Sequence, residues 1–220
     1  MAYGIQIEVW GKYALFSRPE MKTERVSYDV ITPSAARGLI EAVYWHPGLK
    51  YVIDSIYVCN PIRFTNIRRN EVSQKISASN VREVMNGKNA PLFISASEAI
   101  QQRASLVLTD VRYIISAHFE MTAKANADDT PEKFYAMICE RLKGGRHFSQ
   151  PYFGCREFPA NVRLFDGELP PPSEDLLGKK DLGFVLYDMD YSNPKDIRPM
   201  FFRATMIDGM LNLKDCGVVS

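Results

Sequence analysis

Two threonine–proline steps constrain this chain more than any other feature of its sequence. At Thr32-Pro33 and again at Thr130-Pro131, threonine is a favoured helix N-cap and proline is favoured at the first helical position. Apolar residues then recur at helical spacing until His46-Pro47-Gly48 and Gly144-Gly145, which end the two patterns. The sequence therefore predicts two helices, and Gly144 is interpreted as the C-cap of the second.

Stretches typical of β-strands flank both predicted helices. Residues 4–10 alternate apolar and polar side chains, residues 50–58 are rich in Tyr, Val and Ile, and a further strand is expected around 161–165. Two apolar stretches within residues 104–121 surround Thr109-Asp110, which predicts a central hairpin. The order strand, helix, strand, strand, helix, strand is typical of the ferredoxin-like plan that RNA-recognition domains also use.

The predicted fold class is therefore α+β, in two parts. A ferredoxin-like, RRM-like domain is expected over residues 1–168, and a small C-terminal β-sheet domain over residues 169–220. Pro170-Pro171-Pro172-Ser173 breaks the chain between them, and residues 183–191 and 200–207 are again strand-like. The 220 residues suffice for this arrangement, since a single core usually takes about 100–200 residues.

Composition excludes several classes of protein. A chain that is 46% hydrophobic and 24% charged is neither disordered nor rich in long apolar spans, so no membrane partner is expected. The N-terminus lacks the features of a secretory signal, which predicts a cytoplasmic protein. No two cysteines have Cys-x-x-Cys spacing, so we expect reduced thiols and no zinc ribbon. The cysteines are Cys59, Cys139, Cys155 and Cys216.

Charge is uneven along the chain although its net value is only +1. Residues 1–160 hold 20 lysines and arginines against 16 acidic residues, whereas residues 161–220 hold 7 against 10. The N-terminal part is therefore the better partner for a polyanion. Because the protein as a whole lacks a broad basic field, any RNA site must be local.

The best local concentration of basic residues lies in residues 61–75, which we predict to form a basic strand or hairpin arm. Arginine binds phosphate in a bidentate manner, and phosphate neutralisation supplies most non-specific affinity for RNA. The alternative is a solvated strand edge, where basic residues discourage aggregation. The candidate RNA-binding residues of this segment are Arg63, Arg68, Arg69 and Lys75.

Four stretches of the chain resemble the type I-C, d-variant branch of the fifth CRISPR-associated protein family. They are Trp10-Gly11-Lys12-Tyr13-Ala14-Leu15-Phe16; Tyr28 to Pro47, ending Glu41-Ala42-Val43-Tyr44-Trp45-His46-Pro47; Ala117-His118-Phe119-Glu120; and Lys143-Gly144-Gly145-Arg146 through Tyr152-Phe153-Gly154-Cys155-Arg156-Glu157-Phe158. These stretches follow the family's order and cover most of the chain. The resemblance implies a ferredoxin-like domain with a basic hairpin, followed by a smaller β domain.

The same resemblance implies a function. Family members are endoribonucleases that cut CRISPR repeat RNA at the base of its hairpin without a metal or another cofactor. The protein would then stay on the 5′ handle of the guide RNA within the Cascade effector. Its partners there would be the repeat RNA or crRNA and the backbone and large-subunit proteins, and additional binding of DNA is left open.

Metal-free cleavage needs particular groups around the ribose 2′-OH. One group takes its proton, another protonates the leaving 5′-oxygen, and donors stabilise the phosphorane. The resemblance places His118 and Tyr44 at the family's catalytic positions, where His118 is the base or acid and Tyr44 orients the 2′-OH or the phosphate. This prediction requires the two side chains to meet. The alternative is that both are packing residues of the core.

Ser116 departs from the family pattern, because some members have a catalytic lysine two positions before the histidine. Losing such a donor typically costs about 3–4 kcal/mol of transition-state stabilisation. The cations proposed to replace it are Lys12, Arg37 and Arg146. Arg146 and His147 are also candidate RNA contacts because they follow the double glycine. His46 is interpreted as a polar residue at the end of the first helix.

Two rival functions remain open at this point. Other branches of the wider family bind the guide-RNA handle as non-catalytic scaffold subunits, and Ser116 keeps this alternative open. The ferredoxin-like plan also occurs in metabolic enzymes that act on small molecules. No cofactor fingerprint in the sequence favours the metabolic enzyme.

Overall fold

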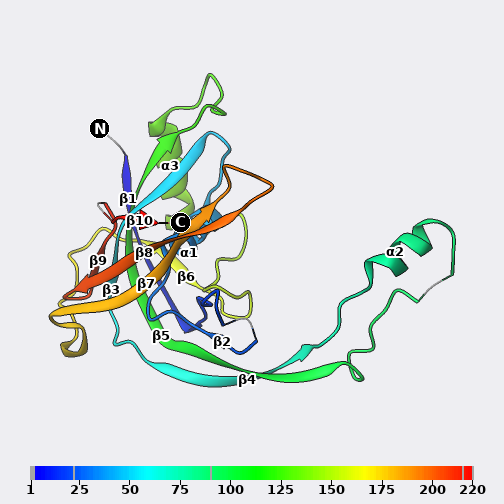
Figure 1. The fold of residues 1–220 in the computed structure, drawn as a ribbon. Helices are drawn as coiled ribbons and strands as arrows, with labels where there is room; N and C mark the ends of the chain where they lie inside the picture. Colours follow the sequence, from blue (N-terminus) through cyan, green and yellow to red (C-terminus); the bar gives the residue numbers. More distant parts are fainter. Residues whose placement is uncertain (1–2, 22, 90, 215, 220) are drawn as a thin grey trace.

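The computed structural model describes residues 3–21, 23–89, 91–214 and 216–219, and a single large, mostly antiparallel sheet dominates it (Figure 1). The helices are α1 (Pro33–Val43), α2 (Ala78–Met85) and α3 (Pro131–Lys143), with a short 3₁₀ helix at Glu174–Leu176. The strands are β1 (Gly4–Ala14), β2 (Arg25–Val26), β3 (Leu49–Val58), β4 (Phe64–Val72), β5 (Ile100–Met121), β6 (Asn161–Leu164), β7 (Lys179–Asp190), β8 (Arg198–Ile207), β9 (Met210–Asn212) and β10 (Val218–Val219).

Both helices predicted from the threonine–proline steps are confirmed as α1 and α3. The Thr32 hydroxyl accepts the Ala35 N–H at 3.2 Å, and the Thr130 hydroxyl accepts the Lys133 N–H at 3.2 Å. Each proline stands at the start of its helix, where its missing N–H costs nothing. Gly144 is confirmed as the C-cap of α3.

The centre of the sheet has the order β3–β5–β1–β6, and every neighbouring pair in it is antiparallel. Helix α1 follows β1 and precedes β3, whereas α3 connects β5 to β6. The helices touch each other and bury their apolar residues in one core with the sheet. Alternate residues of each strand face this core, because successive side chains point to opposite faces of a sheet.

The hairpin predicted at Thr109-Asp110 is wrong, because residues 100–121 form one continuous strand, β5, of 22 residues. Asp110 does adopt a left-handed conformation, with φ 49°, and its carbonyl accepts a bond from Asn60 at 2.7 Å. Here that conformation marks the place where the partner of β5 changes from β3 to β4. A single left-handed residue therefore produces an irregularity in the strand and no chain reversal.

The basic segment forms the hairpin arm that was predicted. Strand β4 pairs with the first half of β5, and Figure 1 shows this arm leaving the body on the side away from α3, with α2 at its far end. Helix α2 lies between β4 and β5, and none of its residues is buried.

The C-terminal strands predicted at 183–191 and 200–207 are present as β7 and β8. They belong to the same sheet as the rest, because β9 pairs with both β8 and β3. Their buried residues, such as Phe202 and Met206, share the main core. The division into domains at residues 168 and 169 therefore stays a prediction. No helix within the described ranges is both long and apolar enough to cross a membrane.

One glycine next to this core provides a test of the fold. Gly154 has φ +76°, and a Cβ there would lie 1.9 Å from the Leu15 carbonyl oxygen. Gly178 has φ +77° but no atom within 4 Å of its Cβ position. We expect Gly178→Ala to lower the free energy of unfolding by about 1–2 kcal/mol, the cost of the left-handed conformation alone. Gly154→Ala should cost about 2 kcal/mol more than that, as measured by urea unfolding, and equal losses would contradict the close contact.

Candidate active site

Tyr44 lies where α1 ends and faces α3. It is the C-cap of α1, with extended backbone angles, and only 5% of its surface is exposed. Its hydroxyl donates to the Met137 sulfur at 3.4 Å, and the Arg141 guanidinium lies 5.2 Å from the centre of its ring. Lys133, Met137 and Arg141 are spaced four residues apart, so they form one stripe along α3. Tyr44 packs against this stripe with a cation on either side.

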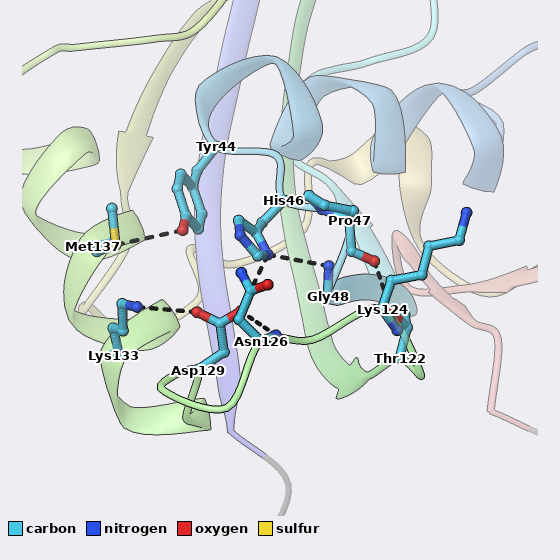
Figure 2. Close-up of polar contacts among 10 residues, drawn as sticks. All are labelled: Tyr44, His46, Pro47, Gly48, Thr122, Lys124, Asn126, Asp129, Lys133 and Met137. Atoms are coloured by element: carbon cyan, nitrogen blue, oxygen red, sulfur yellow. Dashed lines mark hydrogen bonds and ion pairs between the residues drawn. The ribbon is translucent and has the colours of Figure 1, made fainter.

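The His46 ring lies beside the Tyr44 phenol (Figure 2). Both rings pack against Phe134, with centroid distances of 5.0 Å for His46 and 6.2 Å for Tyr44. The Nδ1 of His46 accepts the Gly48 N–H at 3.0 Å. A neutral ring in this arrangement carries its proton on Nε2 and can donate from there. His46 lies three residues beyond the end of α1 at Val43, as a polar residue after the helix, and it also belongs to this cluster.

A carboxylate connects His46 to α3. One oxygen of Asp129 lies 3.8 Å from the Nδ1 of His46, and the other bonds the Lys133 ammonium at 3.0 Å. The Asp129 side chain is only 2% exposed, whereas 47% of the Lys133 side chain is exposed. Lys133 is therefore held in place by a buried anion and still faces solvent.

The ionisation of these groups follows from their neighbours. The Asn126 N–H and then the Lys133 ammonium lower the pKa of Asp129, and the hydrogen bond that Lys133 donates to Asp129 raises the pKa of Lys133. Burial raises the pKa of the Tyr44 phenol, although the nearby cations Lys133 and Arg141 oppose this shift. At neutral pH the site therefore presents a neutral phenol, which donates a hydrogen bond, beside a fixed positive charge.

A pinned loop fixes the geometry of the cluster. Residues 122–130 connect β5 to α3, and Thr122 bonds the turn after His46 through its N–H to the Gly48 oxygen at 2.9 Å and its hydroxyl to the Pro47 oxygen at 2.7 Å (Figure 2). A Cβ on Gly48 would lie 2.7 Å from the Cα of Ala125. The close approach of the two loops therefore requires glycine at this position.

The structure does not bring Tyr44 and His118 together, so the prediction that they meet is wrong. The Tyr51 hydroxyl donates to the Tyr44 carbonyl at 3.1 Å, and Tyr51 pairs with Phe119 across the sheet. Tyr44 is therefore on the Phe119 face. His118 precedes Phe119 on the same strand, so it points to the opposite face.

On that opposite face, His118 is held by a carboxylate. Its Nδ1 lies 2.9 Å from Asp54, and 27% of the His118 side chain is exposed. Ser116 shares this face and accepts a bond from Gln6 at 3.0 Å. The His118–Asp54 pair is therefore ordered and reachable, but it has no cation or phenol from the α1–α3 cluster beside it.

Two predicted RNA-binding residues lie near the Tyr44 cluster. Arg146 and His147 line an open cavity together with Met137, Glu140 and Arg141 at the C-terminal end of α3. Met137 and Arg141 are the same residues that contact Tyr44. Arg146 also pairs with Glu140.

The remaining predicted RNA-binding residues lie on the arm, away from this cluster (Figure 1). Arg63, Arg68 and Lys75 are exposed and have no ion-pair partner in the described part of the chain. Arg69 differs, because it bonds Glu157 at 2.8 Å and Ser105 at 3.1 Å, and its side chain is 13% exposed. Its guanidinium therefore braces the arm against the body.

Sequence reasoning missed the cation that stands beside Tyr44. Two of the proposed substitutes are engaged elsewhere, because Arg37 pairs with Asp188 and Lys12 lies over the Tyr13 ring. Lys133 stands there instead, together with Arg141, and the i, i+4, i+8 spacing of Lys133, Met137 and Arg141 was the signal in the sequence. In the described ranges, no group of three or more His, Cys, Asp or Glu side chains is placed to hold a metal ion.

The lowered pKa of Asp129 predicts a pH dependence of stability. Its ionised form favours folding above the unfolded pKa of about 3.9, and this contribution disappears as pH falls from there through the lower folded pKa. We expect Asp129→Asn to be less stable than the parent protein at pH 7. The difference should hold down to about pH 5 and shrink below about pH 4. Urea unfolding across this range measures it, Asp128→Asn is the control, and a gap independent of pH would contradict the ion pair.

Comparison with known proteins agrees with this architecture. Residues 4–214 match the Cas5d family model, described as CRISPR-associated protein (Cas_Cas5). A protein of Mannheimia succiniciproducens named CRISPR pre-crRNA endoribonuclease Cas5d is 46% identical over 217 residues, covering 97% of this chain and 96% of the relative. A Thermus thermophilus protein of the same name is 41% identical, covering 95% and 90%.

Solved structures share the fold at low sequence identity. A functionally uncharacterized protein from Streptococcus mutans has a TM-score of 0.68 at 21% identity, covering 100% of this chain and 98% of its own. A structure described as a CRISPR-associated protein has a TM-score of 0.67 at 21% identity, with coverage of 100% and 97%. The family match spans nearly the whole chain, and both relatives far exceed chance identity. This protein therefore belongs to the Cas5d family of CRISPR-associated proteins.

Proposed function

We propose that this protein is a pre-crRNA endoribonuclease that cuts CRISPR repeat RNA without a metal and remains on the 5′ handle within a type I-C Cascade complex. The names of its two relatives support the substrate and the reaction. One observation carries the mechanism: a phenol, an imidazole and an ammonium group converge at Tyr44, His46 and Lys133. Such a set can supply the proton donor and the positive charge that metal-free cleavage needs.

The proposed reaction is a transesterification. The ribose 2′-oxygen attacks the adjacent phosphorus, the bond from phosphorus to the 5′-oxygen breaks, and a 2′,3′-cyclic phosphate and a 5′-hydroxyl result. Tyr44 donates a hydrogen bond that orients the reacting groups, and Lys133 stabilises the charge of the phosphorane.

His46 acts as the general acid in this proposal. On protonation, Nδ1 would release the Gly48 N–H and donate to Asp129 instead. The Nε2–H then gives its proton to the leaving 5′-oxygen, while the 2′-OH proton passes to solvent. Asp129 suits this role because one of its carboxylate oxygens lies 3.8 Å from Nδ1, next to the nitrogen that gains the proton. Tyr44 thus keeps the role predicted from sequence, and His46 takes the place of His118 as the imidazole.

We also propose how the fold serves RNA binding. The antiparallel order β6–β1–β5–β3, with α1 and α3 as the crossovers, supports a ferredoxin-like domain. Arg146 and His147 would contact the RNA next to the cut, and Arg63, Arg68 and Lys75 would hold its backbone along the arm. The rival function is a non-catalytic scaffold that binds the handle. The His118–Asp54 pair gives no reason to prefer this scaffold to the enzyme.

Cleavage assays separate these possibilities. With repeat RNA in EDTA, we expect His46→Ala and Lys133→Ala to slow cleavage about 100- to 1000-fold, the usual loss for one transition-state donor. Lys133→Arg should retain most activity because it keeps the charge. His118→Ala is the matched control and should cut at nearly the parental rate. Single-turnover rates measure the effect, and filter binding checks that RNA affinity changes little.

Three outcomes would contradict this assignment in different ways. Loss of cleavage in His118→Ala with full activity in His46→Ala would move the reaction to the open face of the sheet. Binding of repeat RNA by the parent protein without any cleavage would favour the scaffold. Cleavage that EDTA abolishes would show that a metal takes part.

The arm gives a second prediction. We expect Arg63→Ala/Arg68→Ala to weaken RNA binding, and to reduce the slope of log affinity against log salt by about 0.7 for each phosphate that is no longer neutralised. Arg69→Ala should leave that slope unchanged, because its guanidinium is already bonded to Glu157 and Ser105. Salt titrations of RNA affinity measure the slopes. Equal slopes for the parent protein, the double variant and Arg69→Ala would show that the arm is not part of the RNA-binding surface.

A further inference from the structure

A cavity of about 540 Å³ on the outer side of α1 is lined by exposed aromatic rings. Trp45 is 54% exposed, Phe148 74%, Tyr152 40% and Tyr191 64%, although large aromatic side chains are usually buried. The charged part of its lining is the group Arg37, Glu41 and Asp188. We call this cavity the aromatic groove.

The aromatic groove adjoins the proposed reaction centre. Trp45 stands between Tyr44 and His46 in an extended segment, so its side chain points away from theirs. The Phe148 N–H donates to the carbonyl of Ala42 at 2.8 Å, which fastens residues 146–149 across the end of α1. One continuous surface therefore runs from Arg141 through Arg146 and His147 to Phe148 and Trp45.

The charges of the groove favour a base over a phosphate. Two carboxylates and one guanidinium give it a net negative charge, which repels the RNA backbone. Asp188 is occupied, because it binds Arg37 and the Met189 N–H. Glu41 is 35% exposed, and its sole contact with a charged group in the described chain is the Arg37 Nε at 3.5 Å. One Glu41 oxygen is therefore available to accept a hydrogen bond.

We propose that the aromatic groove binds one unpaired nucleobase of the RNA and that Glu41 selects a base with an exocyclic amino group. The rings supply stacking faces, which suit any base. Glu41 accepts from the amino group of cytosine, whereas the corresponding carbonyl of uracil is repelled. This inference rests on the proposed function, because it places the base next to a phosphate at Tyr44 and His46.

Binding of two short RNAs tests the proposal independently of cleavage. Hexacytidine and hexauridine have equal length and charge, so phosphate contacts affect both alike. The protein has 2 tryptophans, and Trp10→Phe leaves Trp45 as the reporter. We expect hexacytidine to quench the Trp45 fluorescence and to bind at least about fivefold more tightly than hexauridine. Glu41→Gln should reduce this preference to less than about twofold, because the amide of glutamine can accept from the amino group of cytosine and can equally donate to the carbonyl of uracil.

A matched pair of phenylalanines controls for general exposure of aromatic rings. Phe148 is 74% exposed in the groove and Phe93 is 76% exposed on the arm. Phe148→Ala should weaken hexacytidine binding by about 5- to 100-fold, the usual effect of one stacking ring, whereas Phe93→Ala should not change it. Circular dichroism checks that each variant is folded.

The outcomes distinguish the groove from the nuclease. Equal affinity for the two RNAs, or an unquenched Trp45 while repeat RNA still binds, would overturn the groove proposal. If the groove proposal failed in this way but repeat RNA were still cleaved, the nuclease assignment would stand, and the groove would not be a base-binding site. Cytosine preference and quenching without cleavage of repeat RNA would support the groove and overturn the nuclease.

Discussion

The alternation of side chains along β5 is the constraint on which the rest of the molecule depends. This strand pairs with β1, β3 and β4, so it joins the centre of the sheet to the arm. Because neighbouring residues of a strand face opposite ways, each step along β5 assigns one side chain to the helix-covered core and the next to the open face. Phe119 falls on the first and His118 on the second.

This separation gives the two faces of the sheet different chemistry. On the helix side, the end of α1 presents Tyr44 and His46 to a stripe of α3, and the buried carboxylate of Asp129 holds Lys133 there. On the open side, His118 bonds the Asp54 carboxylate and shares its face of the sheet with Ser116, Lys50 and Glu120. A reaction that accumulates negative charge on phosphorus is better served by the helix side, where a phenol and an ammonium group stand together.

The basic residues are divided in a corresponding way. Arg63, Arg68 and Lys75 are exposed on the arm and distant from α1 and α3, so the RNA contacts proposed for them lie away from the proposed cut. Arg146 and His147 line a cavity with Met137 and Arg141, which contact Tyr44, and the next residue, Phe148, lines the aromatic groove. A protein with a net charge of only +1 can therefore bind a polyanion, because its cations are placed locally.

The sequence by itself determined the local structure and the family. Threonine caps, first-turn prolines and alternating strands are short-range signals, and they placed α1, α3, β1, β3 and β6 correctly. Only tertiary structure decided that Thr109-Asp110 lies within one strand, because strand pairing outweighed a local turn signal. It also decided which imidazole accompanies Tyr44. His46 reaches Asp129, and through it Lys133, by a contact between residues more than 80 positions apart, and no spacing along the chain encodes such a distance.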